Sequence, residues 1–186
     1  MCDSCTVVAE ELLDAVLLNR VIQRALSIKA RFFTGDGQIS LASLARNILV
    51  HDGGPVFVVM DADTTNDEMA AEGCAMTRMA LGHVSSDDAF DVCAFVPHLE
   101  VVFFEAPGVL RRRLGAHVHD VELELGRFSP MQTLNVLLAR SGRDLESFVR
   151  ELDDCDLDAL LAGPQLSRFI SAADALFSST AGAPAR

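Results

Sequence analysis

The amino-acid sequence predicts an α/β fold: a mostly parallel sheet with flanking helices and a C-terminal helical extension. Two observations lead to this fold class. Between residues 6 and 105, short apolar runs typical of buried strands alternate with longer stretches of helical periodicity. From Ser129 onward only helical patterns follow, and they are separated by glycine, proline and paired aspartates.

The first half of the chain contains four strand patterns, with a helical pattern after each of the first three. The most apolar strand runs from Val56 to Met60, and its uninterrupted apolar side chains predict burial on both faces of the sheet. Ser40 is the residue expected to begin the second helix. The predicted strands are 6–9, 29–34, 56–63 and 90–96, and the helices between them are 12–26, 41–49 and 64–81.

The second half contains predicted helices at 130–140, 145–152, 157–161 and 164–177. Ser129-Pro130 is typical of a helix start, because proline fits the first helical position. We expect an α/β domain over residues 1–115 and a helical extension over 116–178 that packs on it or forms the face of a homodimer. A disordered tail is expected over 179–186.

Composition excludes some classes of protein. The chain has 186 residues, half of them hydrophobic, and no apolar run approaches the ~20 residues needed to cross a bilayer. The start Met1-Cys2-Asp3 lacks the features of a secretory signal, so we expect no membrane association and a cytoplasmic location. The odd number of cysteines predicts reduced thiols, although Cys2-x-x-Cys5 has the spacing of half a zinc site.

The net charge of −12 opposes strong unaided binding to nucleic acid, whose affinity comes largely from cations that replace counterions on phosphate. Bound divalent ions would offset part of this charge locally. Arg111, Arg112 and Arg113 form one compact basic patch that is a candidate contact to substrate phosphate; the alternative is a solvated helix face. A basic partner protein would supply the remaining positive charge.

Two carboxylates, Asp61 and Asp63, follow the apolar run 56–60 directly. If the strand continues through Asp63, both side chains lie on the same side and converge just beyond the sheet. Carboxylates at the carboxyl end of a strand suit Mg²⁺ or Mn²⁺, which prefer a few such ligands together with water and substrate phosphate. The alternative is that both aspartates begin a polar turn or cap the next helix.

The first strand also ends in acidic residues. Glu10 and Glu11 follow it, and Asp14 lies one turn farther along. Because parallel strands present their carboxyl ends at the same edge of a sheet, we expect Glu10 to share metal with Asp61 and Asp63.

These motifs resemble the Toprim domain of topoisomerases, primases, recombination mediators and the overcoming-lysogenization-defect nucleases. Residues 7–14, Val-Val-Ala-Glu-Glu-Leu-Leu-Asp, are similar to the family's first strand with its acids, and residues 58–63, Val-Val-Met-Asp-Ala-Asp, to its Asp-x-Asp strand. The resemblance covers about residues 6–105 and implies a Toprim/Rossmann-like sheet. Glu11 stands where the family usually has glycine, and the basic residue often found after that glycine is missing.

The resemblance implies a nuclease that cleaves phosphodiester bonds of DNA or RNA with Mg²⁺ or Mn²⁺. Glu10, Asp61 and Asp63 would be its catalytic residues, Glu10 would double as general base, and Asp14 would help to hold metal. Because some nuclease systems pair a Toprim protein with an ATPase, the resemblance also implies an ATPase partner.

Residues 96–100, Val-Pro-His-Leu-Glu, resemble a Val-Pro-x-x-Glu segment of a small Toprim-like group. The resemblance implies that Glu100 faces the metal as an outer ligand or a positioning acid, and the alternative is an acid that begins a helix. His98, beside Glu100, is the candidate for proton transfer. His117 and His119 would face the same way on a strand and offer imidazole ligands, but histidines in polar loops are commoner.

Two other functions stay open. Residues 61–65 fit the Asp-x-Asp-x-Thr motif of haloacid-dehalogenase-like phosphatases, in which Asp61 would attack phosphorus and Asp63 would act as acid and base. That family also needs a later lysine or arginine and carries its nucleophile on the first strand, whereas Lys29 is the only lysine here. The other function is that of a catalytically degenerate Toprim-like module with an interaction or regulatory role.

Overall fold

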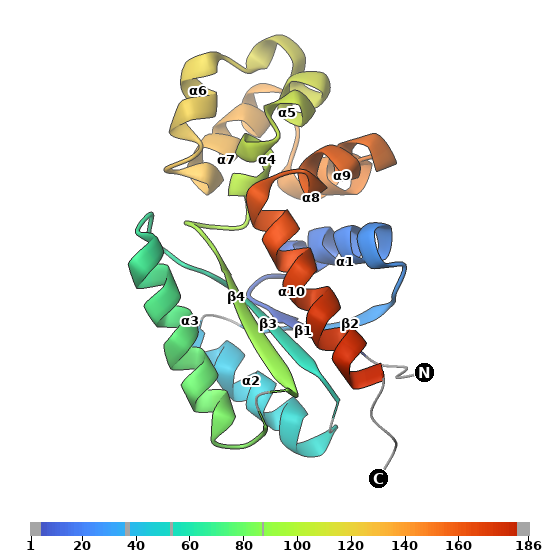
Figure 1. Cartoon of the computed structure of the whole chain (residues 1–186). Helices are drawn as coiled ribbons and strands as arrows, with labels where there is room; N and C mark the ends of the chain where they lie inside the picture. Colours follow the sequence, from blue (N-terminus) through green and yellow to red (C-terminus); the bar gives the residue numbers. More distant parts are fainter. Residues whose placement is uncertain (1–4, 36–37, 53, 87, 182–186) are drawn as a thin grey trace.

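The structure, a computed structural model, describes residues 5–35, 38–52, 54–86 and 88–181. Within these ranges, strands pair in parallel in the order β2-β1-β3-β4 (Figure 1). The α/β fold class predicted from the sequence is therefore confirmed. The strands are β1 (Cys5–Ala9), β2 (Ala30–Thr34), β3 (Val56–Asp61) and β4 (Phe90–Phe95).

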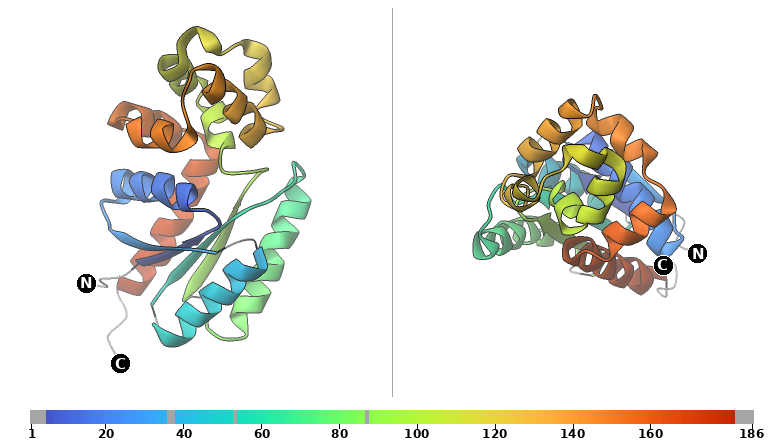
Figure 2. Two further views of the ribbon diagram at one scale, coloured as in Figure 1. Left: turned by 180° about the vertical axis from the view of Figure 1, so that it is seen from behind. Right: turned by 90° about the horizontal axis from the view of Figure 1, so that it is seen from above.

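Helices cover both faces of the sheet. α1 (Leu12–Leu26) and α10 (Pro164–Ala181) lie on one face, whereas α2 (Gln38–His51) and α3 (Asp67–Gly82) lie on the other (Figures 1 and 2). The two cores that result explain the composition of the central strands, which must be apolar on both sides.

β3 illustrates this double burial. Phe57 and Val59 belong to the core under α1 and α10, whereas Val58 and Met60 belong to the core under α2 and α3. All four side chains are almost fully buried. The uninterrupted apolar run that predicts β3 is therefore a requirement of its central place in a three-layer sandwich.

The helical extension lies at the carboxyl end of the strands (Figure 1). One apolar core joins it to the sheet face under α1. None of the helices in the described ranges combines the length and the apolar character that crossing a bilayer requires. The elements of the extension before α10 are α4 (Val101–Glu105), α5 (Pro107–Leu114), the 3₁₀ helix η1 (Gly115–His117), α6 (Asp120–Leu125), α7 (Pro130–Arg140), α8 (Leu145–Glu151) and α9 (Asp154–Leu161).

Two sequence predictions are wrong. β3 ends at Asp61 and does not continue through Asp63, which has a φ of 53°. Aspartate tolerates this left-handed conformation, and it turns the chain out of the strand direction. At the other end of the chain, α10 extends to Ala181, so residues 179–181 are helical where a disordered tail is predicted. The rest of that predicted tail, 182–186, lies outside the described residues.

α10 is held against the sheet by aromatic rings. The ring of Phe169 meets that of Phe57 at 5.4 Å between centroids, with nearly perpendicular planes, and that of Phe95 at 6.0 Å. Edge-to-face contacts of this kind add to the energy of burial. α10 therefore completes one layer of the α/β unit, although it lies far beyond the domain boundary predicted at residue 115.

We expect Phe169→Ala to lower the free energy of unfolding by about 3–5 kcal/mol, because it leaves a cavity beneath α10. Phe128→Ala is the matched control, since the Phe128 side chain is exposed, and it should change stability by less than about 0.5 kcal/mol. Urea denaturation followed by circular dichroism measures both. Equal effects of the two substitutions would contradict a structural role of α10 in the sheet layer.

Candidate functional site

The strand order reverses between β1 and β3. From β1 the chain passes through α1 to β2 on one side, and from β2 it returns through α2 to β3 on the other side of β1. Open α/β sheets usually bind ligands at such a reversal. Glu10 follows β1 and Asp61 ends β3, so both carboxylates belong to this point of the fold.

Asp61 lies at the centre of the site. Its backbone N–H donates to Oε1 of Glu10 at 3.2 Å, and its Oδ1 accepts the N–H of Leu99 at 2.9 Å. Its Oδ2 lies 3.2 Å from Nδ1 of His98. Only 16% of the Asp61 side chain is exposed, so these neighbours hold it in a fixed position. The structure thus brings Glu10 and Asp61 together, as the two strand patterns predict.

Asp63 reaches the site through a turn and not along a strand. Its N–H donates to the carbonyl of Pro97 at 3.0 Å, which joins the end of β3 to the segment after β4. Its Oδ1 lies 3.6 Å from Nδ1 of His98. Because 66% of its side chain is exposed, Asp63 stands at the open side of the site, whereas Asp61 lies deep within it.

Asp14 enters the site from the first turn of α1. Its Oδ2 accepts the N–H of Glu11 at 3.0 Å, which satisfies one of the N–H groups that a helix start leaves unpaired. Glu11 itself has φ −120° and ψ 160°, an extended conformation open to any residue. The backbone therefore does not require the glycine that the Toprim pattern has at this position.

Glu100 immediately precedes α4, but its side chain makes no capping hydrogen bond there. Its Oε2 is buried without a hydrogen-bond partner among the described residues. Together with Asp14, Glu100 lines a cavity of about 10 Å³, near the lower limit for one water molecule. The predicted alternative, an acid that merely begins a helix, leaves this buried oxygen unexplained.

The carboxylates of the site repel one another in a poorly solvated environment. Burial, followed by the nearby Asp61, raises the pKa of Asp14 to about 8, and burial, followed by Glu100, raises the pKa of Asp61 to about 8. Burial also raises the pKa of Glu10 and of Glu100. A bound proton or a cation would relieve this repulsion.

The protein alone does not present a finished metal site. Within the described ranges, no three histidine, cysteine, aspartate or glutamate side chains stand close enough together to hold a metal ion. Glu10 and Asp14 each accept a backbone N–H, and Asp61 and Asp63 both lie beside His98. Ligation would therefore require some of them to move toward a common point.

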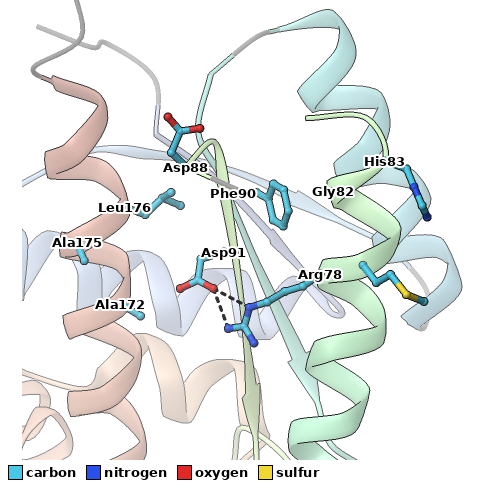
Figure 3. Close-up of a pocket in the computed structure, with 10 residues that line it drawn as sticks. Arg78, Gly82, His83, Asp88, Phe90, Asp91, Ala172, Ala175 and Leu176 are labelled. Atoms are coloured by element: carbon cyan, nitrogen blue, oxygen red, sulfur yellow. Dashed lines mark hydrogen bonds and ion pairs between the residues drawn. The ribbon is translucent and has the colours of Figure 1, made fainter. Parts of the chain in front are cut away.

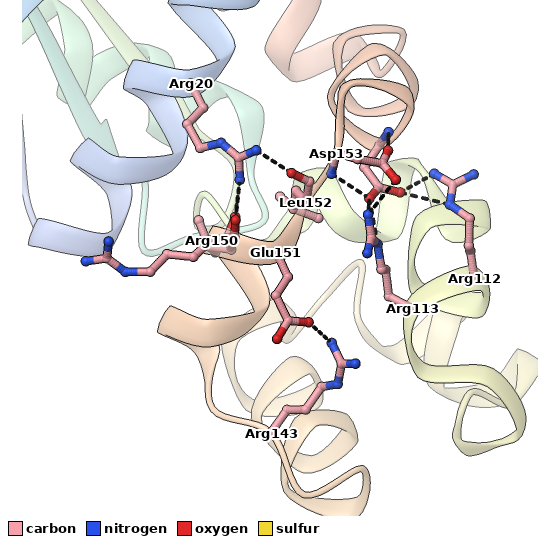
Figure 4. Close-up of polar contacts among 10 residues, drawn as sticks. Arg20, Arg112, Arg113, Arg143, Arg150, Glu151, Leu152 and Asp153 are labelled. Carbon is pink, nitrogen blue, oxygen red and sulfur yellow. Dashed lines mark hydrogen bonds and ion pairs between the residues drawn. The ribbon is translucent and has the colours of Figure 1, made fainter.

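The arginine triplet is engaged within the extension. Arg111 pairs with Asp120, Arg112 with Asp156, and Arg113 with both Asp153 and Asp156. Asp156 is fully buried, and its pKa is lowered by hydrogen bonds from the two arginines although burial opposes the shift. Figure 4 shows Arg112 and Arg113 directed at the α8–α9 junction near Asp153. The predicted contact of these arginines with substrate phosphate stays a prediction, and here all three hold the extension together.

His117 and His119 do not lie on a strand: His117 ends η1, and His119 precedes α6.

The larger cavities of the molecule lie away from the acidic site. A cleft of about 760 Å³ between α3, β4 and α10 is lined by Arg78, His83 and Asp91, among others (Figure 3). Arg78 and Asp91 form an ion pair there at 2.8 Å. No candidate catalytic residue lines this cleft.

Two backbone contributions to the site could not be predicted from residue types. The N–H groups of Asp61 and Leu99 each hold a site carboxylate, of Glu10 and Asp61 respectively. Backbone donors carry no residue-type signal, and only the segment 96–100 after β4, which contains His98 and Glu100, marks the place of Leu99 in the chain. No protein-family model, curated protein or solved structure matches this chain.

We expect the stability of the metal-free protein to fall as the pH rises from about 5 to about 8. The folded-state pKa values of Asp14 and Asp61 are raised from 3.8 to about 8, so the folded protein binds more protons than the unfolded chain within this window. The stabilising contribution of the two carboxyl groups is full below about pH 4 and is lost as the pH approaches 8.

Thermal unfolding in the presence of a chelator, measured between pH 5 and pH 8, tests this expectation. Asp14→Asn and Asp61→Asn should each flatten the profile, because amides do not titrate. Asp67→Asn in the exposed first turn of α3 is the control and should keep the wild-type slope. A melting temperature that rises between pH 5 and pH 8 would contradict the assignment.

Proposed function

We propose that this protein catalyses metal-dependent cleavage of phosphodiester bonds in nucleic acid, at the site formed by Glu10, Asp61 and Asp63. The observation that carries the proposal is the contact between Glu10 after β1 and Asp61 at the end of β3, at the reversal of strand order. Acidic residues that served only a turn or a helix cap would not need to meet from the ends of two different strands. They would also not need a third buried acid beside them.

The donor chemistry supports Mg²⁺ or Mn²⁺ as the cofactor. Every acidic group here is a carboxylate, and hard divalent cations prefer oxygen ligands. Glu100 Oε2 lacks a partner among the described residues, and burial together with repulsion between neighbouring carboxylates raises the pKa values of Asp14 and Asp61, a cost that a bound cation would reduce. We assign Glu10, Asp61 and Asp63 as direct ligands, with Asp14 and Glu100 behind them. When bound, the metal would polarise the phosphate and lower the pKa of water.

The remaining roles, proton transfer and positioning, would fall to side chains and backbone groups of the protein. Asp61 orients His98 through Nδ1, so the imidazole can carry a proton to or from a reacting oxygen. Glu10, held by the N–H of Asp61, is the candidate base. Asp63, exposed at the open side, is the acid best placed to meet substrate first. The backbone N–H of Leu99 keeps Asp61 from turning away.

A haloacid-dehalogenase-like phosphatase is less well supported. In that mechanism Oδ1 or Oδ2 of Asp61 would have to attack phosphorus, but Leu99 N–H and His98 contact these two oxygens. The chemistry also needs a lysine or arginine beside the nucleophile, and here His98 is the basic side chain in contact with Asp61. Glu10 would have no role.

We propose DNA or RNA as the substrate and a basic partner, such as an ATPase, as its carrier. The net charge of −12 disfavours a free-standing nucleic-acid binder. The arginine triplet, paired with aspartates in the extension, adds little free positive charge. A catalytically degenerate regulatory subunit is the second candidate, and its mark would be metal binding without cleavage.

Cleavage of supercoiled plasmid, linear DNA and structured RNA with Mg²⁺ or Mn²⁺ tests the proposal. Glu10→Gln and Asp61→Asn should each lower the cleavage rate by at least about a hundredfold. Removing a direct metal ligand should lower activity at least as much as removing a residue that only hydrogen-bonds to a ligand. Glu68→Gln, an exposed carboxylate at the start of α3, is the matched control and should retain the wild-type rate.

Metal binding is measured on the same variants by calorimetry with Mn²⁺. Loss of binding and of cleavage together in Glu10→Gln supports the shared site. Cleavage by Glu10→Gln at the wild-type rate, or a covalent phosphate on Asp61, would refute it. If the wild-type protein binds Mn²⁺ but cleaves none of the three substrates, the regulatory subunit becomes the better description.

A further inference from the structure

The two outer strands of the sheet are treated differently. An unpaired strand edge carries free N–H and C=O groups and invites pairing with another chain, so proteins usually block it. β4 is blocked by side chains along its outer side. Arg78 donates to the carbonyl of Val92 at 2.5 Å, and Arg168 donates to that of Ala94 at 2.7 Å.

The same blocking involves the N–H of Val92 and the residue just after β4. The N–H of Val92 donates to the side chain of Asp91 at 2.7 Å. Beyond the strand, the side-chain amide of Gln165 bonds both the N–H and the carbonyl of Val96, each at 2.7 Å. Four side chains from α3, α10 and β4 itself therefore use the groups that a further strand would need. Figure 3 shows Arg78 and Asp91 together on this outer side of β4.

β2 is the opposite edge, and it has no such protection. The N–H of Gly35 bonds the carbonyl of Ala9, so residues 31, 33 and 35 turn their backbone groups toward β1. Because successive residues alternate, Ala30, Phe32 and Thr34 turn theirs outward. Within the part of the chain that the structure describes, no side chain or backbone group bonds these outward N–H and C=O groups.

The side chains of β2 are also unusually open for a strand of an α/β sheet. Arg31, Phe33 and Thr34 are exposed, and Phe33 leaves 36% of its surface open to solvent. The guanidinium of Arg31 sits 5.8 Å from the centre of the Phe33 ring and pairs with Asp52 at 3.0 Å. The edge therefore offers three outward backbone positions beside a neutralised cation and an aromatic ring.

We propose that β2 pairs with β2 of a second copy, antiparallel about a two-fold axis at Phe32, to join the two sheets into one. In this register Phe32 faces Phe32 of the other copy, and Ala30 faces Thr34. Arg31 faces Phe33 of the other copy, which repeats across the interface the cation–aromatic contact already present within each strand.

The self-complementary pattern is the reason to choose a second copy as the occupant. When the two-fold axis passes through Phe32, the two Arg31 side chains do not face each other. Each Arg31 also pairs with Asp52 of its own chain. The net charge of −12 opposes association of two copies, and salt screens this repulsion at long range. The interface is small, so monomer and dimer should exchange with protein concentration.

Sedimentation equilibrium from about 1 μM to about 1 mM protein tests the proposal. The wild-type protein should dimerise within this range. Thr34→Pro removes an outward N–H that the fold does not use, and it should weaken the dimer at least about tenfold. Thr34→Val keeps the N–H and is the matched control. Phe33→Lys should also weaken the dimer, because it faces Arg31, whereas Phe33→Glu should keep it.

Amide hydrogen exchange locates the contact. The amides of Phe32 and Thr34 should exchange more slowly at high than at low protein concentration, whereas amides at the blocked edge of β4 should not respond. A wild-type protein that stays monomeric at all concentrations would overturn the proposal. So would a dimer that Thr34→Pro and Phe33→Lys both leave intact, since that dimer would use another surface.

Discussion

The parallel pairing of β1 with β3 determines where the candidate functional site of this protein lies. It puts the carboxyl ends of two strands side by side at the reversal of strand order, where Glu10 follows β1 and Asp61 is the last residue of β3. Burying carboxylates together is unfavourable, and the raised pKa values of Asp14 and Asp61 express that cost. The large apolar core on both faces of the sheet makes the arrangement tolerable, because it holds the strand ends in place regardless of the repulsion between them.

Much of this arrangement follows from local sequence patterns. α1 and α7 begin and end where periodicity predicts, and the doubly buried β3 is evident from its unbroken apolar run. The failure at Asp63 has a local cause that residue type does not reveal, namely a left-handed conformation after the strand. What the sequence could not predict depends on contacts between distant residues: Leu99 with Asp61, the aspartate partners of the arginine triplet, and the return of α10 to the sheet.

The extension is bound to the α/β unit by polar as well as apolar contacts. Arg20 of α1 donates to the carbonyls of Val149 and Leu152 at the end of α8 (Figure 4). Arg24, also of α1, pairs with Asp158 of α9 at 2.7 Å. The carbonyls at a helix end lack partners within the helix, so a guanidinium satisfies them well. These two arginines therefore attach the helices of the extension to α1.

The place of α10 in the layer beside α1 also has a consequence during synthesis. Phe57 and Phe95 are made early, but the ring that covers them, Phe169, emerges from the ribosome about seventy residues after Phe95. Until then one face of the sheet has no complete cover, and apolar surface of that size attracts other nascent chains. The α/β half therefore cannot reach its final packing while it is still being translated, and a ribosome-associated chaperone would have most to protect in the interval between β4 and α10.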